Sequence, residues 1–305
     1  MQLFQKIPVR KTVILGLVSI LIIFILFKTL VNVVDFSRVL RNINWFYFFL
    51  AFATMVPTFI LSVIRWHSVL RSAGFNVSFW KIFKIIGSSM SLSIVPGRLG
   101  DLARSYPLRN QIPISQSIGT IVLEKIIDIC VLLLFSGVGL FILGHPIFGS
   151  LMFLLAIGAI PLLEILNILI KKLPLKSDLV NKLQDAVSVL NKVKQRKTIL
   201  SMAILASSAN WTLSMFQAYW LFKAVGSIVP FSAIFAFQPL SIFMGLIPIT
   251  IAGVGTRDSA ILYFFRNFAA PEQSLAVGIL YGLQSYWITA LLGIPLLYFF
   301  LRDSD

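Results

Sequence analysis

The residues best suited to chemistry lie in the stretch 88–110, which carries Arg98, Asp101, Arg104 and Arg109 in an otherwise apolar region. Arginine suits phosphate because its planar guanidinium donates two parallel hydrogen bonds. On a helix, Asp101 and Arg104 share a face because they are three residues apart. The stretch therefore predicts a phosphate clamp in which Asp101 fixes one guanidinium. The alternative is anchoring at a bilayer surface, which we favour for Arg109.

Two carboxylates, Glu124 and Asp128, interrupt a later apolar run. They are four residues apart, so they face the same side of a helix. A carboxylate inside a bilayer is costly unless it is paired or hydrated, so both are expected to face a polar cavity. Their role stays open between an ion pair with Arg98 or Arg257, contact with a cationic headgroup, proton coupling, and a structural pair with Lys125 or a later arginine.

A second charged pair, Arg257 and Asp258, follows Gly255. A helix that begins near Gly255 would direct the positive end of its dipole towards this pair, which again suits phosphate. The alternative is an exposed ion pair in a loop. Both charged stretches contain residues that interrupt helices, because proline removes a donor and glycine loosens the backbone. The predicted breaks are Pro96, Gly97, Gly100, Pro248, Gly253 and Gly255.

The elements that hold these residues are expected to be membrane spans. Of the 305 residues, 58% are hydrophobic and only 12% are charged, and runs of about 20 apolar residues recur, which is the length that crosses a bilayer. The net charge of +15 is compatible with nucleic acid. The basic residues lie between the apolar runs, however, so membrane orientation and anionic lipid explain the charge better, and no nucleic-acid partner is expected.

The sequence predicts an all-α polytopic membrane protein in which residues 1–305 form a single integral membrane domain. About six transmembrane helices are expected, at 12–30, 45–64, 116–143, 149–169, 199–222 and 274–300. The second is predicted to end at an interfacial boundary, Arg65–His67. Two pairs of shorter segments are predicted to be re-entrant broken helices, 78–94 with 99–109 and 230–246 with 256–267. A basic amphipathic helix on the cytoplasmic surface is predicted at 171–197.

Basic residues set the predicted orientation. With a cytoplasmic N-terminus and broken pairs that do not cross, the cytoplasmic segments hold 19 of the 26 lysines and arginines. This excess of positive charge inside predicts a multi-pass protein of the cytoplasmic (inner) membrane, with both termini in the cytoplasm. If either broken pair crosses the bilayer, the later topology reverses.

A shift of 157 residues without a gap aligns the two broken stretches. It matches Asp101 with Asp258 and Arg109 with Arg266, and the identities cluster around the breaks. This predicts a duplication. Three predicted spans separate corresponding points, so the copies would face opposite sides of the membrane, as in inverted-repeat transporters with a site near the midplane. The repeats are expected at about 45–143 and 199–300, joined by the span 149–169 and the helix 171–197.

Two motifs carry a family resemblance: P-G-R-L-G-D-x-x-R at 96–104 and G-V-G-T-R-D at 253–258. With the acidic third span, they resemble the lysylphosphatidylglycerol synthase transmembrane region family, whose members are also called flippase-like integral membrane proteins. The resemblance covers about 12–300. The family's second motif usually has the form P-G-G-x-G-x-R-E, and here Ala252 replaces the local proline and Asp258 the glutamate.

The resemblance implies a lipid-translocating module. In bifunctional members it moves aminoacylated phosphatidylglycerol between leaflets, and a separate soluble domain synthesises that lipid. No such domain follows Arg302 here, so a stand-alone member is expected. Many stand-alone relatives are associated with glycosyltransferases or polyprenyl-phosphate sugar pathways, which makes a glycosyltransferase or lipid-synthesis enzyme the expected protein partner.

We expect a flippase-like transporter for a phosphate-bearing lipid, which is an aminoacyl-phosphatidylglycerol, another phospholipid or a polyprenyl-phosphate-linked sugar. Two alternatives remain: a membrane-embedded transferase that acts on a lipid phosphate, with Asp101 or Glu124 as its catalytic carboxylate, and a scaffold for a glycosyltransferase complex. No G-x-S-x-G, Walker or H-E-x-x-H pattern occurs, and the two histidines lack metal-ligand spacing. We therefore expect no catalytic residue, metal or cofactor. No oligomeric state is predicted.

Overall fold

The computed structural model describes residues 9–92, 99–172, 185–186, 188–189, 192–193, 196–247 and 249–302. Every regular element in these residues is helical, which confirms the all-α class. The predicted breaks Pro96, Gly97 and Pro248, the predicted site residue Arg98 and most of the predicted surface helix 171–197 lie outside the described residues.

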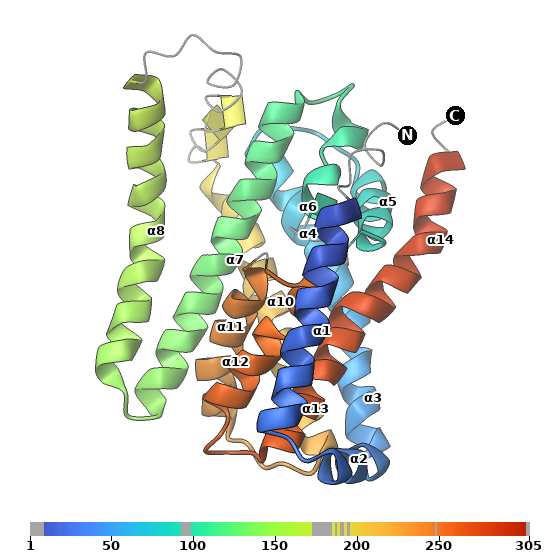
Figure 1. Ribbon diagram of the computed structural model, residues 1–305. Coiled ribbons are helices and arrows are strands. Elements are labelled where there is room, and N and C mark those ends of the chain that lie inside the picture. Colours follow the sequence, from blue (N-terminus) through green and yellow to red (C-terminus); the bar gives the residue numbers. More distant parts are fainter. Residues whose placement is uncertain are drawn as a thin grey trace.

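The helices of the first half of the chain form part of a helical bundle and pass back and forth between its two ends (Figure 1). Its second, third and fifth helices begin at a side-chain cap, where Asn32, Asn44 or Ser78 accepts a hydrogen bond from a backbone N–H of the first turn. The elements are α1 (Val9–Thr29), α2 (Val33–Arg41), α3 (Trp45–Ala53), α4 (Met55–Ser72), α5 (Phe79–Met90), α6 (Leu99–Ala103), the 3₁₀ turn η3 (Tyr106–Leu108) and α7 (Ile114–Ile142).

The second half of the chain also combines long helices with short ones. A π-helical turn lies inside its last long stretch, where the wider backbone interrupts regular α-helix. The elements are α8 (Pro146–Lys172), α10 (Lys197–Ala224), α11 (Phe231–Leu246), the 3₁₀ turn η4 (Ile251–Gly253), α12 (Thr256–Phe264), α13 (Pro271–Gly282), the π-helical turn η5 (Leu283–Ile288) and α14 (Thr289–Arg302).

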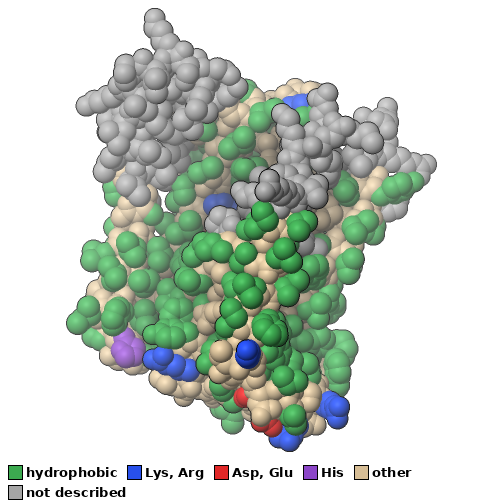
Figure 2. Space-filling model, in the orientation of Figure 1, with side chains coloured by type: hydrophobic (Ala, Val, Ile, Leu, Met, Phe, Trp, Pro, Cys, Tyr) green, Lys and Arg blue, Asp and Glu red, His purple; other side chains and the backbone are tan. Residues whose placement is uncertain are grey.

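Several of these helices have the length and composition of membrane spans. Four described stretches qualify, and the pair α1–α2, bent by 102°, makes a fifth if it is counted as one span. Hydrophobic side chains cover much of the described face of the bundle seen in Figure 2, and several lysines and arginines are visible near its lower end. A multi-pass membrane protein is therefore confirmed. The four stretches are Trp45–Ser72, Ile114–Ile142, Lys197–Ala224 and Pro271–Tyr298.

The second span is longer than the sequence predicted. It continues to Ser72, whereas the prediction ended it at residue 64, before an interfacial boundary at Arg65–His67. That prediction is wrong, because Arg65 is only 5% exposed and forms ion pairs inside the bundle. Neutralisation of its charge allows the helix to continue through protein where an unpaired arginine would need water or lipid headgroups.

The helix α10 lies at the centre of the packing and contacts α3, α4, α7 and α13. Its polar side chains Ser207, Asn210, Ser214 and Gln217 recur every three or four residues and therefore share one face. All four are buried. This polar face meets α4 and α7 on one side and α13 on the other, which is where the charged residues of the bundle lie.

The contact between α7 and α11 gives a test of the fold. A Cβ added at Gly139 would collide with the backbone of Ala236. Gly139→Ala is therefore expected to lower the free energy of unfolding by about 1–3 kcal/mol, the usual range for overpacking. Gly158→Ala in α8 is the control, because nothing lies within 4 Å of its added Cβ. Thermal unfolding in detergent measures both variants, and equal stability would contradict the packing.

Candidate functional site

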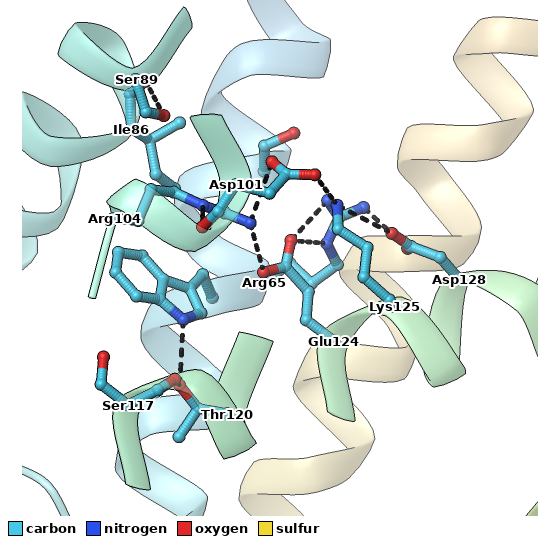
Figure 3. Close-up of polar contacts among 12 residues, drawn as sticks. Arg65, Ile86, Ser89, Asp101, Arg104, Ser117, Thr120, Glu124, Lys125 and Asp128 are labelled. Carbon is cyan, nitrogen blue, oxygen red and sulfur yellow. Dashed lines mark hydrogen bonds and ion pairs between the residues drawn. The ribbon is translucent and has the colours of Figure 1, made fainter. Parts of the chain in front are cut away.

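Six charged side chains meet inside the bundle (Figure 3). They come from α4, from α6 and the residue that follows it, and from α7. Three are cations and three are carboxylates, so their formal charges sum to zero. We call them the charge cluster: Arg65, Asp101, Arg104, Glu124, Lys125 and Asp128.

Arg65 lies at the centre of the charge cluster. Its Nη2 and Nε donate to Glu124 Oε1 at 2.7 and 3.0 Å, and its Nη1 lies 2.9 Å from Asp128 Oδ1. The Glu124 carboxylate is fully buried. A buried carboxylate needs close cations and hydrogen bonds to offset its desolvation. One guanidinium therefore joins two carboxylates that are one turn apart on α7, and it fixes α4 against that helix.

Arg104 is the second buried cation of the cluster, at 3% exposure. Its Nη2 lies 3.3 Å from Glu124 Oε2 and 3.2 Å from Asp101 Oδ1. Its guanidinium lies over the Trp66 ring, 5.0 Å from the centroid, an arrangement that adds a cation–π attraction. The indole in turn donates to Thr120 Oγ1 at 3.2 Å. The aromatic ring and the two carboxylates hold this guanidinium in one position.

Asp101 and Lys125 form the exposed edge of the cluster. Lys125 Nζ lies 3.0 Å from Asp101 Oδ2, and both side chains are 30% exposed. Asp128, on the inner side, accepts hydrogen bonds from Ser207 Oγ at 2.7 Å and from Trp211 Nε1 at 3.0 Å. The cluster therefore has an inner part held by α10 and an outer edge formed by Asp101 and Lys125.

A cavity of about 240 Å³ lies beside the charge cluster. Since a water occupies about 30 Å³ of liquid, the cavity has room for several waters or one small polar headgroup. Every cluster residue except Glu124 lines it. Within the described residues, no group of three or more His, Cys, Asp or Glu side chains is placed to hold a metal ion. The other polar and aromatic walls are Ser62, Ser89, Asn210, Trp211, Ser285 and Tyr286.

The second predicted pair, Arg257 and Asp258, lies apart from the charge cluster. Arg257 Nη2 lies 2.9 Å from Asp258 Oδ1 and donates to the backbone oxygen of Gly278 at 3.2 Å. The rings of Tyr281 and Tyr286 flank the guanidinium, each with its centroid 5.4 Å away. Both charged residues are 1% exposed, so the alternative of an exposed loop pair is wrong.

Glycines on α13 make room for this pair. A Cβ at Gly278 would lie 2.8 Å from Asp258 Oδ1, and one at Gly282 would lie 2.5 Å from Arg257 Nη2. Real Cβ atoms do not approach other atoms so closely. The spacing of the two glycines, four residues apart, places both on the face of α13 that meets α12.

The described break residues have different surroundings. Gly253 and Gly255 have φ of +74° and +94°, a region that side chains with a Cβ rarely adopt. Gly253 ends η4, and Gly255 immediately precedes α12, where its N–H donates to Asp258 Oδ2 at 2.9 Å. Gly100 lies within α6, close to Leu92. The chain is therefore interrupted between η4 and α12.

The structure brings four predicted site residues, Asp101, Arg104, Glu124 and Asp128, into one cluster and leaves Arg257 with Asp258 in a separate pair. Among the alternatives left open for Glu124, the structure does not form the ion pair with Arg257, because the carboxylate contacts Arg65 and Arg104. A binding role for these residues stays a prediction.

Sequence reasoning misses Arg65 as a site residue, because the run Arg65-Trp66-His67 has the composition of a membrane interface. A signal for it exists in the same helix. Thr58, Ser62 and Arg65 recur at spacings of four and three in an apolar stretch, which marks one polar face. Lys125, on the exposed edge, was considered only as a structural partner.

Membrane-length helices around a charge-balanced cluster and a polar cavity define a multi-pass integral membrane protein. The family model described as the lysylphosphatidylglycerol synthase TM region matches residues 13–293. The chain belongs to this family, and the resemblance carried by its two motifs is thereby confirmed.

Similar proteins of archaea extend this assignment. UPF0104 membrane protein MJ1595 of Methanocaldococcus jannaschii is 24% identical, over 99% of this chain and 98% of its own. UPF0104 membrane protein MJ1078 of the same organism is 26% identical, over 69% of this chain and 94% of its own. UPF0104 membrane protein PH1989 of Pyrococcus horikoshii is 23% identical, over 77% and 81%. The match to MJ1595 therefore extends over nearly the whole of both chains.

The ion pairs of the cluster give a test of its contribution to stability. Glu124→Gln would remove the buried carboxylate that Arg65 and Arg104 share, and it would leave one positive charge of the cluster unbalanced. It is expected to lower the free energy of unfolding by about 3–5 kcal/mol, as for other broken buried pairs.

The exposed pair Asp35–Arg38 provides the matched control, since its Nη1–Oδ1 distance is 2.6 Å but its side chains are 47% and 67% exposed. Asp35→Asn is expected to cost at most about 1 kcal/mol. Denaturation of both variants in detergent measures the difference. A Glu124→Gln protein as stable as Asp35→Asn would show that the cluster does not need its buried carboxylate.

Proposed function

We propose that the protein translocates a phosphate-bearing lipid, with the headgroup in the cavity and the acyl or prenyl tails in the bilayer. The observation that carries the proposal is the cavity itself, which two buried guanidiniums line inside a bundle of membrane-length helices. Guanidinium is the side-chain group best matched to phosphate. The candidate substrates are an aminoacyl-phosphatidylglycerol, another phospholipid and a polyprenyl-phosphate-linked sugar.

Each predicted site residue has a role in this proposal. Arg98 and Arg104 hold the phosphate in the first half of the chain, and Arg257 holds it in the second half. The carboxylates Asp101, Glu124, Asp128 and Asp258 balance these charges. The cavity adjoins the first half-site, whereas Arg257 is packed under Tyr286. One accessible and one closed half-site are what alternating access requires.

An inverted repeat, with copies at 45–143 and 199–300, is part of the proposal. Two observations support it. The helices α6 and α7 begin at residues 99 and 114, and α12 and α13 begin at 256 and 271, so both pairs differ by 157 residues. The helix α7 and the stretch α13–α14 run in opposite directions through the bundle (Figure 1). The segments around α5–α6 and α11–α12 would be the two re-entrant pairs.

The proposed topology has six spans, which are the five described above and α8. The first turn of α1 and the last turn of α14 lie at the same end of the bundle, together with α5 and α6 (Figure 1). This arrangement supports two cytoplasmic termini in a cell (inner) membrane and a cavity nearer the cytoplasm. A glycosyltransferase or lipid-synthesis enzyme on that side would supply or consume the lipid.

Transport is testable in proteoliposomes that contain only this protein. We expect it to accelerate transbilayer exchange of a fluorescent phosphatidylglycerol or polyprenyl-phosphate sugar, measured by quenching of the outer leaflet. Arg104→Ala is expected to abolish exchange, because the buried guanidinium is lost. Arg109→Ala, an exposed arginine close by, is the control and should retain it. Unchanged exchange of these lipids with wild-type protein would refute the proposal for them.

Topology is tested by two matched substitutions in a Cys130→Ser background, which removes the chain's single cysteine. Asn76→Cys lies in the exposed connection between α4 and α5, and Asn267→Cys lies in the exposed connection after α12. An impermeant maleimide should label Asn267→Cys in intact cells and Asn76→Cys only after permeabilisation. Labelling of both from the same side would contradict the proposed topology.

A further inference from the structure

We propose that Asp101 is a displaceable counter-ion: the phosphate of the substrate takes its place on Arg104 and Lys125, and the site therefore selects a phosphate with a single negative charge. This inference rests on the proposed function, since it concerns how the same cavity receives its lipid. It names the class of headgroup that fits and a residue that regulates binding.

Asp101 differs from the other carboxylates of the cluster in its exposure. Its side chain is 30% exposed, compared with 0% for Glu124 and 6% for Asp128. It lies on α6, a helix of five residues, at the edge of the cavity. Its side chain already reaches water, whereas Glu124 accepts two hydrogen bonds from Arg65 and Asp128 accepts two from side chains of α10. Asp101 is therefore the carboxylate that an incoming anion can replace.

Two buried guanidinium nitrogens beside the cavity have hydrogen-bonding capacity to spare. Arg104 Nη2 and Arg65 Nη1 are within ion-pair distance of carboxylates, yet neither makes a well-aligned hydrogen bond to any group in the described part of the chain. A buried donor without an aligned acceptor is unfavourable. A phosphate presents oxygens in several directions, so it can align with both donors where a planar carboxylate cannot.

Charge counting then sets the substrate class. With Asp101 moved aside, three cations face the two inner carboxylates, Glu124 and Asp128, and the remaining charge is +1. A phosphodiester carries one negative charge and restores neutrality. A phosphomonoester carries about −1.5 to −2 at pH 7 and would leave an excess of negative charge in a partly buried site. The cavity should therefore prefer diesters, the class that includes glycerophospholipids and polyprenyl-phosphate sugars.

The replacement of Asp101 by a phosphate is tested by measuring lipid binding to the purified full-length protein in detergent. Titration calorimetry would compare dioctanoyl phosphatidylglycerol, a diester, with dioctanoyl phosphatidic acid, a monoester. Wild-type protein should bind the diester more tightly. Asp101→Asn should tighten diester binding by about tenfold, the effect of one nearby charge at a partly exposed site. Lys125→Gln should weaken it by about the same factor.

Two further variants complete the design. Asp101→Asn combined with Lys125→Gln returns the remaining cluster to zero charge, so its affinity should lie near that of the wild type. Asp35→Asn removes an exposed carboxylate from a comparable i,i+3 pair and should change nothing. Thermal unfolding checks that each variant is folded, and Asp101→Ala replaces Asp101→Asn if the latter is not.

The outcomes separate this inference from the proposed function. The counter-ion role would be overturned if Asp101→Asn bound the diester no more tightly than the wild type, or did not bind it. It would also be overturned if the wild type bound the monoester more tightly than the diester. If wild-type protein still accelerates lipid exchange in proteoliposomes, the transport proposal stands while the counter-ion role falls. Tighter diester binding by Asp101→Asn supports the counter-ion role whether or not transport is observed.

Discussion

The need for electroneutrality in an interior that excludes water is the constraint on which this bundle depends. A single arginine or glutamate among membrane-length helices would be strongly unfavourable. Arg65, Arg104 and Glu124 are tolerable only together, so α4, α7 and the residues after α6 must meet in one register. The helix α10 closes the inner side by donating to Asp128 from two side chains. Helix arrangement and cavity position both follow from this pairing.

The second half of the chain meets the same constraint with a buried ion pair of adjacent residues. Arg257 is neutralised by its neighbour Asp258 and enclosed by tyrosine rings, in space that glycines on α13 leave open. Tyr286 belongs to both regions, since it lines the cavity and also lies against the Arg257 guanidinium. It is part of the π-helical turn η5, where the backbone departs from regular α-helix. A rearrangement of this turn would therefore change both regions together.

The sequence allowed the helices to be predicted because apolar runs and breaks are local features. It also placed Glu124 and Asp128 on one face, because helical periodicity is local. The sequence could not identify the ion-pair partners of these carboxylates. Arg65 and Glu124 are 59 residues apart, and helical periodicity does not encode which helices are in contact. The same limit misplaced the end of the second span. Likewise, the burial of Arg257 depends on Gly282, a glycine on another helix whose role only packing reveals.

The central claim is that the buried guanidiniums beside the cavity hold the phosphate of a lipid. Mass spectrometry of lipids retained by the purified protein tests it most directly, with wild type, Arg104→Ala and Arg109→Ala extracted in parallel. The account predicts that a phosphodiester lipid is retained by the wild type and by Arg109→Ala and is lost from Arg104→Ala. Retention of the same lipids by all three proteins, or of no phosphate-bearing lipid by the wild type, would contradict it.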